Sequence, residues 1–123
     1  MKNFFILIPL FNDWKSVTQL LDKIDFQVKD WEANVSVVIV NDASTEKNNN
    51  LKFGFKKIKS VKILNMKKNT VHQRCIAAGL KYIYKNEQFE WVVVMDADGE
   101  DRPEELNYFY DKAGKNLNTT ITG

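Results

Sequence analysis

Trp91-Val92-Val93-Val94-Met95 runs directly into Asp96-Ala97-Asp98-Gly99-Glu100. A short apolar run of this kind is typical of a strand buried in a parallel sheet, and ligands bind beyond the carboxyl ends of such strands. Carboxylates at alternate positions can converge on a hard cation such as Mg²⁺ or Mn²⁺, which prefers oxygen ligands and keeps open positions for phosphate oxygens. The stretch therefore predicts a metal site for a phosphorylated substrate. Asp and Gly also follow strands simply because they turn the chain, so the rest of the sequence must support this interpretation.

Strand-like and helix-like segments alternate along the chain. Besides residues 91–95, the segments 4–10, 35–40 and 61–64 are predicted strands, and residues 119–121 resemble the start of another. Apolar residues spaced by three and four predict helices between them. The expected inward faces are Val17, Leu20, Leu21, Ile24 and Val28; Cys75, Ile76, Gly79, Leu80, Ile83 and Tyr84; and Leu106, Phe109, Tyr110 and Ala113. Residues 51–58 are ambiguous between a loop and a short helix. The alternation implies a layered α/β fold with a parallel sheet and right-handed crossovers.

The composition is that of an ordinary globular domain. We expect one domain over residues 1–123, because 123 residues with 44% apolar and 28% charged side chains suffice for a core. The net charge of +2 is too small to indicate a nucleic-acid partner. Cys75 is the single cysteine, which excludes an intrachain disulfide and favours a reducing, cytoplasmic compartment. No apolar run approaches the ~20 residues of a transmembrane segment, and Pro9 interrupts the first run, which argues against a signal peptide.

Polar residues also follow the first two predicted strands. Phe11, Asn12 and Asp13 supply a flat ring and polar groups, which a nucleobase requires for stacking and pairing. Asp42 can accept a hydrogen bond from a base N–H or a ribose hydroxyl. Each residue has a structural alternative, because Phe11 can belong to the core, Asn12 or Asp13 can cap a helix, and Asp42 can form an Asx-turn. Three polar strand ends in one short α/β chain nevertheless favour a nucleotide pocket.

These strand ends form an ordered set along residues 4–106. The set is Pro9-Leu-Phe11-Asn12-Asp13; Asn41-Asp42-Ala43-Ser44; Asn69, His72-Gln73 and Ala77-Ala-Gly79-Leu80; and Asp96-Ala97-Asp98-Gly99-Glu100-Asp-Arg-Pro103-Glu104. It resembles family 2 glycosyltransferases, and most closely the branch that moves hexoses from nucleotide sugars to polyprenyl phosphate. The resemblance implies the GT-A fold, whose nucleotide-binding half is a Rossmann-like three-layer α/β/α structure with a mostly parallel sheet.

The resemblance also implies roles for the matched positions. The donor, a nucleotide-diphosphate sugar, would be bound by Pro9, Phe11, Asn12, Asp13, Asp42, Ser44, Asn69, Asp96 and Ala97. Among these residues Asp42 would contact the base, and Asp96 would face the sugar nucleotide. Asp98 would bind the Mg²⁺ or Mn²⁺ ion that bridges the diphosphate, with Asp96 and Glu100 as further oxygen ligands. The implied reaction is sugar transfer with inversion at the anomeric carbon.

Three positions depart from the family's pattern. Asn41 and Ala43 stand where the second strand usually ends in Asp-Asp-Gly-Ser, which weakens a ribose or base contact and removes the glycine that eases the turn. Val71 occupies the last position of the family's Asn-x-Gly, where a bulkier residue hinders the approach of phosphate. His72 is the only histidine, and we interpret it as a helix-start residue that shapes the pocket, because the sequence offers it no catalytic partner.

The acceptor side of the site is expected to lie outside this chain. In the family the acceptor-side residues come later in the domain, so no catalytic residue is assigned. We expect a chain truncated at its C-terminus that binds the donor with little or no transfer. The sheet edge left by such a truncation could pair with a second copy. A polyprenyl-phosphate acceptor would place the parent protein at the cytoplasmic face of a membrane.

Two other classes are compatible with a small α/β domain. A response-regulator receiver needs an acid pair after the first strand and a phosphorylated Asp after the third. Here Asp13 stands alone, and residues 61–66 end without an acid. A non-catalytic nucleotide-binding or scaffold domain with a degenerate site is favoured by Asn41, Ala43 and Val71. Metal-dependent nucleotide binding would separate it from an intact donor site.

Overall fold

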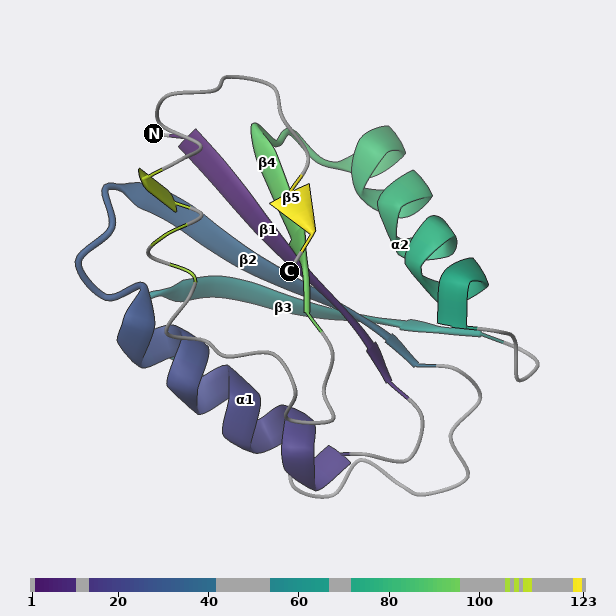
Figure 1. Ribbon diagram of the computed structural model, residues 1–123, viewed down its shortest axis with the longest axis horizontal. Helices are drawn as coiled ribbons and strands as arrows, with labels where there is room; N and C mark the ends of the chain where they lie inside the picture. The colour runs from purple at the N-terminus through teal and green to yellow at the C-terminus, as the bar shows by residue number, and fades with distance from the viewer. Residues whose placement is uncertain are drawn as a thin grey trace.

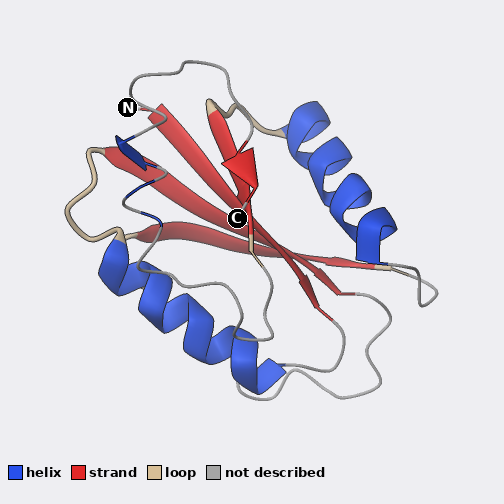
Figure 2. Cartoon of the chain, viewed as in Figure 1, coloured by secondary structure: helices blue, strands red, loops and turns tan. Residues whose placement is uncertain are grey.

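The computed structural model describes residues 2–10, 14–41, 54–66, 72–95, 106, 108, 110–111 and 121–122. The elements are β1 (Lys2–Leu10), α1 (Trp14–Gln27), β2 (Ala33–Asn41), β3 (Ile58–Asn65), α2 (His72–Asn86), β4 (Trp91–Val94) and β5 (Ile121–Thr122). Residues 106, 108, 110 and 111 are also helical. Figure 2 shows this alternation of strands and helices, which confirms the predicted α/β fold class.

The strands form one five-stranded sheet in the order β3-β2-β1-β4-β5. Each neighbouring pair is parallel. β1 lies at the centre, where it pairs with β2 along its whole length and with β4 from Phe4 to Leu7. The register aligns Leu10 with Asn41 and Asn41 with Asn65, so the carboxyl ends of β1, β2 and β3 are level with one another.

Successive strand residues alternate between two apolar faces. Phe4, Ile6 and Ile8 of β1 pack in one cluster with the buried face of α1, whereas Phe5 and Leu7 pack in a second cluster with α2. Figure 1 shows α1 and α2 on opposite sides of the sheet. This arrangement is the three-layer α/β/α architecture that the sequence predicts. The α1 residues that make this contact are Trp14, Val17, Leu20, Leu21 and Ile24.

Aromatic side chains close the core at the amino ends of the strands. The ring of Phe4 stacks on Trp91 with centroids 4.8 Å apart and meets Trp31 edge-on at 5.2 Å. Trp31 in turn stacks on Tyr110 at 4.3 Å. The Tyr110 hydroxyl accepts a hydrogen bond from the backbone N–H of Glu32, 3.2 Å away. The cluster therefore joins β1, β4, the turn after α1 and the helical residue Tyr110.

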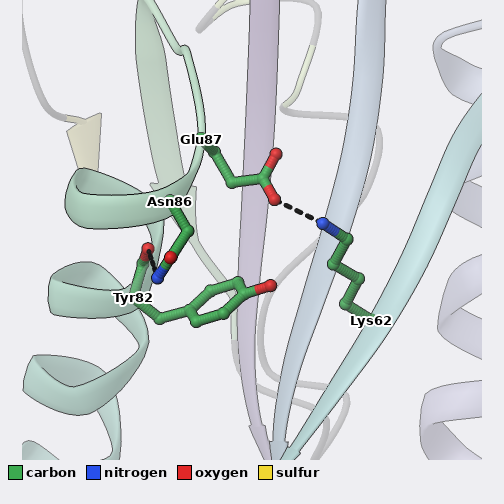
Figure 3. A network of polar contacts seen from close by, with 4 residues as sticks. All are labelled: Lys62, Tyr82, Asn86 and Glu87. Atoms are coloured by element: carbon green, nitrogen blue, oxygen red, sulfur yellow. Dashed lines mark hydrogen bonds and ion pairs between the residues drawn. The ribbon is translucent and has the colours of Figure 1, made fainter.

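A polar network ties the end of α2 to the edge strand β3. Figure 3 shows Lys62 of β3 reaching the carboxylate of Glu87, which lies just beyond α2. This hydrogen bond raises the pKa of the Lys62 ammonium group. The Lys62 Nζ also lies 5.8 Å from the centroid of the Tyr82 ring, and Asn86 donates from Nδ2 to the Tyr82 carbonyl at 3.0 Å. The contacts of Lys62 with Glu87 and Tyr82 join the end of α2 to β3 at the surface of the molecule.

The structure corrects some details of the predicted elements. Tyr84 is 78% exposed and does not belong to the buried face of α2. The inward row of that helix runs through Cys75, Gly79 and Ile83, four residues apart, and Tyr84 lies about 100° around the helix from Ile83. The short helix considered for residues 51–58 is wrong for its last residues, because 54–57 are not helical and Ile58 begins β3. Phe109 and Ala113 lie outside the described residues.

Candidate functional site

The carboxyl ends of the parallel strands lie at one edge of the sheet. The N–H of Met95, just after β4, donates to the Leu7 carbonyl of β1 at 2.9 Å. The N–H of Met66, just after β3, donates to the Asn41 carbonyl of β2 at 2.8 Å. Backbone pairing therefore continues to the last described residue before each loop on these strands. β1, β2, β3 and β4 all end at this edge, which we call the carboxyl edge.

The strand order reverses between β1 and β4. From β1 the chain adds β2 and then β3 on one side, whereas β4 and β5 lie on the other side. The helix that follows β1 covers one face of the sheet and the helix that precedes β4 covers the opposite face (Figure 1). In open α/β sheets such a reversal leaves a crevice outside the carboxyl ends of the two central strands, and ligands bind there. The position where a ligand is expected is thus set by topology.

Only one of the predicted donor-binding residues is described. Pro9 is buried in β1, where it is aligned with Val40 of β2. The other predicted donor and metal residues lie outside the described residues: Phe11, Asn12, Asp13, Asp42, Ser44, Asn69, Asp96, Ala97, Asp98 and Glu100. The chain connects them directly to described strand ends, since Asp42 follows Asn41 and Asp96 follows Met95.

The predicted metal ligands also lie outside the described residues. Within the described ranges no group of three or more His, Cys, Asp or Glu residues could hold a metal ion. The assignment of Asp96, Asp98 and Glu100 as metal ligands stays a prediction. Their donor set consists of carboxylate oxygens alone, which suits Mg²⁺ or Mn²⁺ and not a softer metal.

The carboxyl edge carries one polar contact that sequence reasoning missed. Asn41 ends β2 and Asn65 ends β3, and the Nδ2 of Asn41 donates to the Oδ1 of Asn65 at 2.9 Å. We call this contact the carboxyl-edge amide bridge. A similar bridge joins Asn34 of β2 to Asn3 of β1 at 3.0 Å, near the amino ends of the strands. The signal for both is the pairing register, which places each asparagine opposite another.

A small cavity lies at the opposite edge of the sheet. It encloses about 210 Å³ beside the amino ends of β1, β2 and β4, and it is lined by Lys2, Phe4, Glu32, Ala33, Trp91, Tyr110 and Asp111. The Lys2 ammonium lies 4.9 Å from the centroid of the Trp91 ring. Trp91 is only 1% exposed, so its ring offers little surface for a ligand to stack on. This cavity is therefore a weaker candidate site than the carboxyl edge.

Comparison with known protein families matches residues 5–123 to Glycosyl transferase family 2. A search of curated proteins finds no match. In the part of the chain that the structure describes, no helix has the length and apolar character needed to cross a membrane. The family match covers all but the first four residues, and its region contains the parallel sheet with helices on both faces. The chain therefore belongs to glycosyl transferase family 2.

Proposed function

We propose that this protein binds a nucleotide-diphosphate sugar together with Mg²⁺ or Mn²⁺ at the carboxyl edge, and that the parent enzyme transfers the sugar with inversion. Family membership supports sugar transfer as the reaction class. The observation that carries the donor-site proposal is the reversal of strand order between β1 and β4. The segments 11–13 and 96–100 follow these two strands, and they contain most of the nominated donor and metal residues.

The side chain of each predicted site residue suits the role that we propose for it. Phe11 would stack on the base, and Asn12, Asp13 and Asp42 would accept or donate hydrogen bonds at its edge or at the ribose. Asp96, Asp98 and Glu100 would hold the cation. A bound divalent cation neutralises charge on the diphosphate leaving group. The protein's own contribution is to hold the donor so that its anomeric carbon faces the acceptor.

We propose polyprenyl phosphate as the acceptor, from the motif likeness to that branch of the family. A phosphate oxygen is already a nucleophile at neutral pH, so this acceptor needs little help from a general base. The proposal places the parent protein at the cytoplasmic face of a membrane. The acceptor is tested by supplying the parent protein with either polyprenyl phosphate or a sugar whose free hydroxyl group can accept the transferred sugar. Transfer to the sugar hydroxyl alone would contradict polyprenyl phosphate as the acceptor.

Nucleotide titrations test the donor site directly. We expect calorimetry to detect binding of UDP or GDP in the presence of Mn²⁺ and much weaker binding in its absence. Asp98→Asn should weaken the Mn²⁺-dependent binding at least about tenfold, because a carboxylate ligand is replaced by a neutral amide. Asp30→Asn, which changes an exposed acid in the turn after α1, is the matched control. It should bind the nucleotides as tightly as the chain without substitutions.

The same titrations separate the proposal from a non-catalytic domain with a degenerate site. Asn41, Ala43 and Val71 depart from the family's usual residues and favour that alternative. Flat titrations with both nucleotides, with and without Mn²⁺, would support the degenerate site and contradict the donor-site proposal. Equal binding with and without Mn²⁺ would contradict the metal site alone.

A further inference from the structure

The carboxyl-edge amide bridge ends two rows of core residues. In β2 the row on the α1 face runs through Val37 and Ile39 to Asn41, and in β3 it runs through Val61 and Ile63 to Asn65. The four apolar residues pack in or against the core cluster, whereas Asn65 is exposed. The bridge therefore presents polar groups where the core gives way to solvent at the carboxyl edge.

The bridge sets the orientation of the Asn65 amide and leaves its Nδ2 amine for a ligand. Its Oδ1 accepts the hydrogen bond from Asn41 at 2.9 Å, so the amide orientation is set by this contact. The remaining group is the Nδ2 amine, which donates to no other group in the described part of the chain. An amide NH₂ donates and does not accept. The Nδ2 of Asn65 can thus donate to an acceptor oxygen of a ligand, and it cannot pair with a second donor.

The distance across the sheet indicates which part of a donor would reach Asn65. β3 and β4 are separated by β2 and β1, so their ends lie three strand spacings apart. At about 4.8 Å for each spacing, this is about 14 Å. The length is comparable to that of an extended nucleoside diphosphate. A diphosphate held by carboxylates after β4 would therefore place the ribose near β1 and β2, and the base near β2 and β3.

We infer that Asn65 selects the base of the donor nucleotide by donating its Nδ2–H to a carbonyl oxygen of that base. The inference rests on the proposed donor site. It favours uracil or guanine, which present the carbonyl oxygens O4 and O6. It disfavours cytosine and adenine, which carry an amino group at the equivalent position and would set two donors against each other. Asn41 is a positioning residue, because it orients the Asn65 amide.

The amide bridge at the other end of the sheet supplies a matched control. Asn34 and Asn3 form the same kind of hydrogen bond between paired strands, at 3.0 Å. Asn3 is additionally held through its backbone, since its carbonyl accepts from the Glu90 N–H at 2.9 Å and its own N–H donates to the Glu90 carboxylate. A bridge that only fastens strands should have the same effect at either end.

The test compares nucleotides that differ at this one position of the base. Dissociation constants are measured by calorimetry for UDP against CDP and for GDP against ADP, each with Mn²⁺. For whichever carbonyl base binds, we expect a preference of about tenfold or more over its amino counterpart, the size of one hydrogen bond. Asn65→Asp keeps an acceptor for Asn41 but replaces the donor by a carboxylate oxygen, so the preference should move toward CDP or ADP. Asn65→Ala should bring the ratio close to one.

The control variant is Asn3→Asp, which likewise replaces the accepting amide of its bridge by a carboxylate and should leave the ratio unchanged. Thermal melts of all variants separate loss of stability from loss of selectivity, and the ratio of two nucleotides on one variant does not depend on its folded fraction. If the chain without substitutions binds UDP and CDP equally, and GDP and ADP equally, the role of Asn65 is overturned. The proposed donor site is not affected by that result. An Asn65→Asp ratio that matches the Asn3→Asp ratio would also overturn the role of Asn65. Absence of all nucleotide binding would overturn the donor site itself.

Discussion

At Gly79 the helix α2 lies so close to the sheet that there is no room for a side chain. A Cβ atom at this position would lie 2.3 Å from Cδ1 of Leu7 and 2.9 Å from Cγ2 of Val40. Both neighbours are fully buried, so they have little room to move. Glycine is unfavourable inside a helix, and here the close approach of helix and sheet gives the reason for its presence.

Gly79→Ala should destabilise the protein. The extra methyl group costs about 1–3 kcal/mol of overpacking, and the better helix propensity of alanine returns about 1 kcal/mol. We expect a net loss of about 1 kcal/mol in the free energy of unfolding, measured by urea denaturation. The free-energy difference between alanine and glycine that comes from helix propensity alone is measured separately with Ala77→Gly, at an exposed position of the same helix.

The contact with Leu7 is checked by a double variant. Leu7→Ala opens the space that the new methyl group needs, so Gly79→Ala should cost less in that background than in the parent sequence. Equal costs in both backgrounds would show that the methyl group does not meet Leu7. A stabilised Gly79→Ala variant would show that the neighbours relax without strain.

At the scale of elements, Asp25 connects α1 to the start of β3. Its Oδ1 accepts hydrogen bonds from the backbone N–H groups of Lys57 and Ile58, at 2.8 and 2.9 Å. Its Oδ2 accepts from the N–H of Lys56 at 3.1 Å. Burial acts to raise the pKa of this carboxyl group, but the three backbone donors and the charge of Lys56 outweigh it and hold the pKa below its usual value. The ionised side chain thus fixes the turn that leads into the edge strand.

Asp25→Asn should lower stability at neutral pH by about 1–3 kcal/mol, because hydrogen bonds to a charged acceptor are stronger than those to an amide. The folded-state pKa is lowered, so this stabilisation is present above the ordinary pKa of aspartate and is lost as the pH falls through the folded-state value. The difference between the two proteins should therefore shrink in acid. Urea denaturation at a series of pH values from neutral to strongly acidic measures it.

Asp22→Asn is the control for the change of charge. Asp22 is exposed on the same helix, so its substitution should leave both the stability and its dependence on pH nearly unchanged. If Asp25→Asn and Asp22→Asn behave alike, the three backbone hydrogen bonds do not depend on the carboxylate charge.

At the scale of the whole molecule, the three tryptophans report on one core. Trp14 begins α1, Trp31 follows it, and Trp91 begins β4, yet all three are buried in the same cluster. They lie at both ends of the sheet's α1 face. We therefore expect tryptophan fluorescence to move to longer wavelength in a single cooperative step on unfolding.

Urea denaturation followed by fluorescence and by far-ultraviolet circular dichroism tests this expectation. The two signals should give the same midpoint, because the α1 face carries the larger share of the buried residues. An earlier fluorescence midpoint would mean that the aromatic cluster loosens while the sheet persists. The experiment needs no substitution, since the sequence supplies the probes.

The fold was predictable because buried strands and amphipathic helices leave strong local patterns. Val35–Val40 and the apolar face of α1 are examples, and both are confirmed. Strand starts were predicted less well, because Lys2 and Asn34 are polar but still pair through their backbones. The candidate site was predictable only as a series of strand ends. The carboxyl-edge amide bridge depends on register between β2 and β3, and the spacing of Asn41 and Asn65 along the chain does not reveal it.

The central place of β1 has a consequence for the synthesis of the protein. β1 is complete at residue 10, but one of its two partners, β4, begins at residue 91. At a translation rate of about 5–20 residues per second, this interval is on the order of ten seconds. While the chain is still being synthesised, one edge of the apolar strand β1 therefore lacks its hydrogen-bonding partner β4. We therefore expect the nascent chain to expose one unpaired edge of β1 until β4 has emerged.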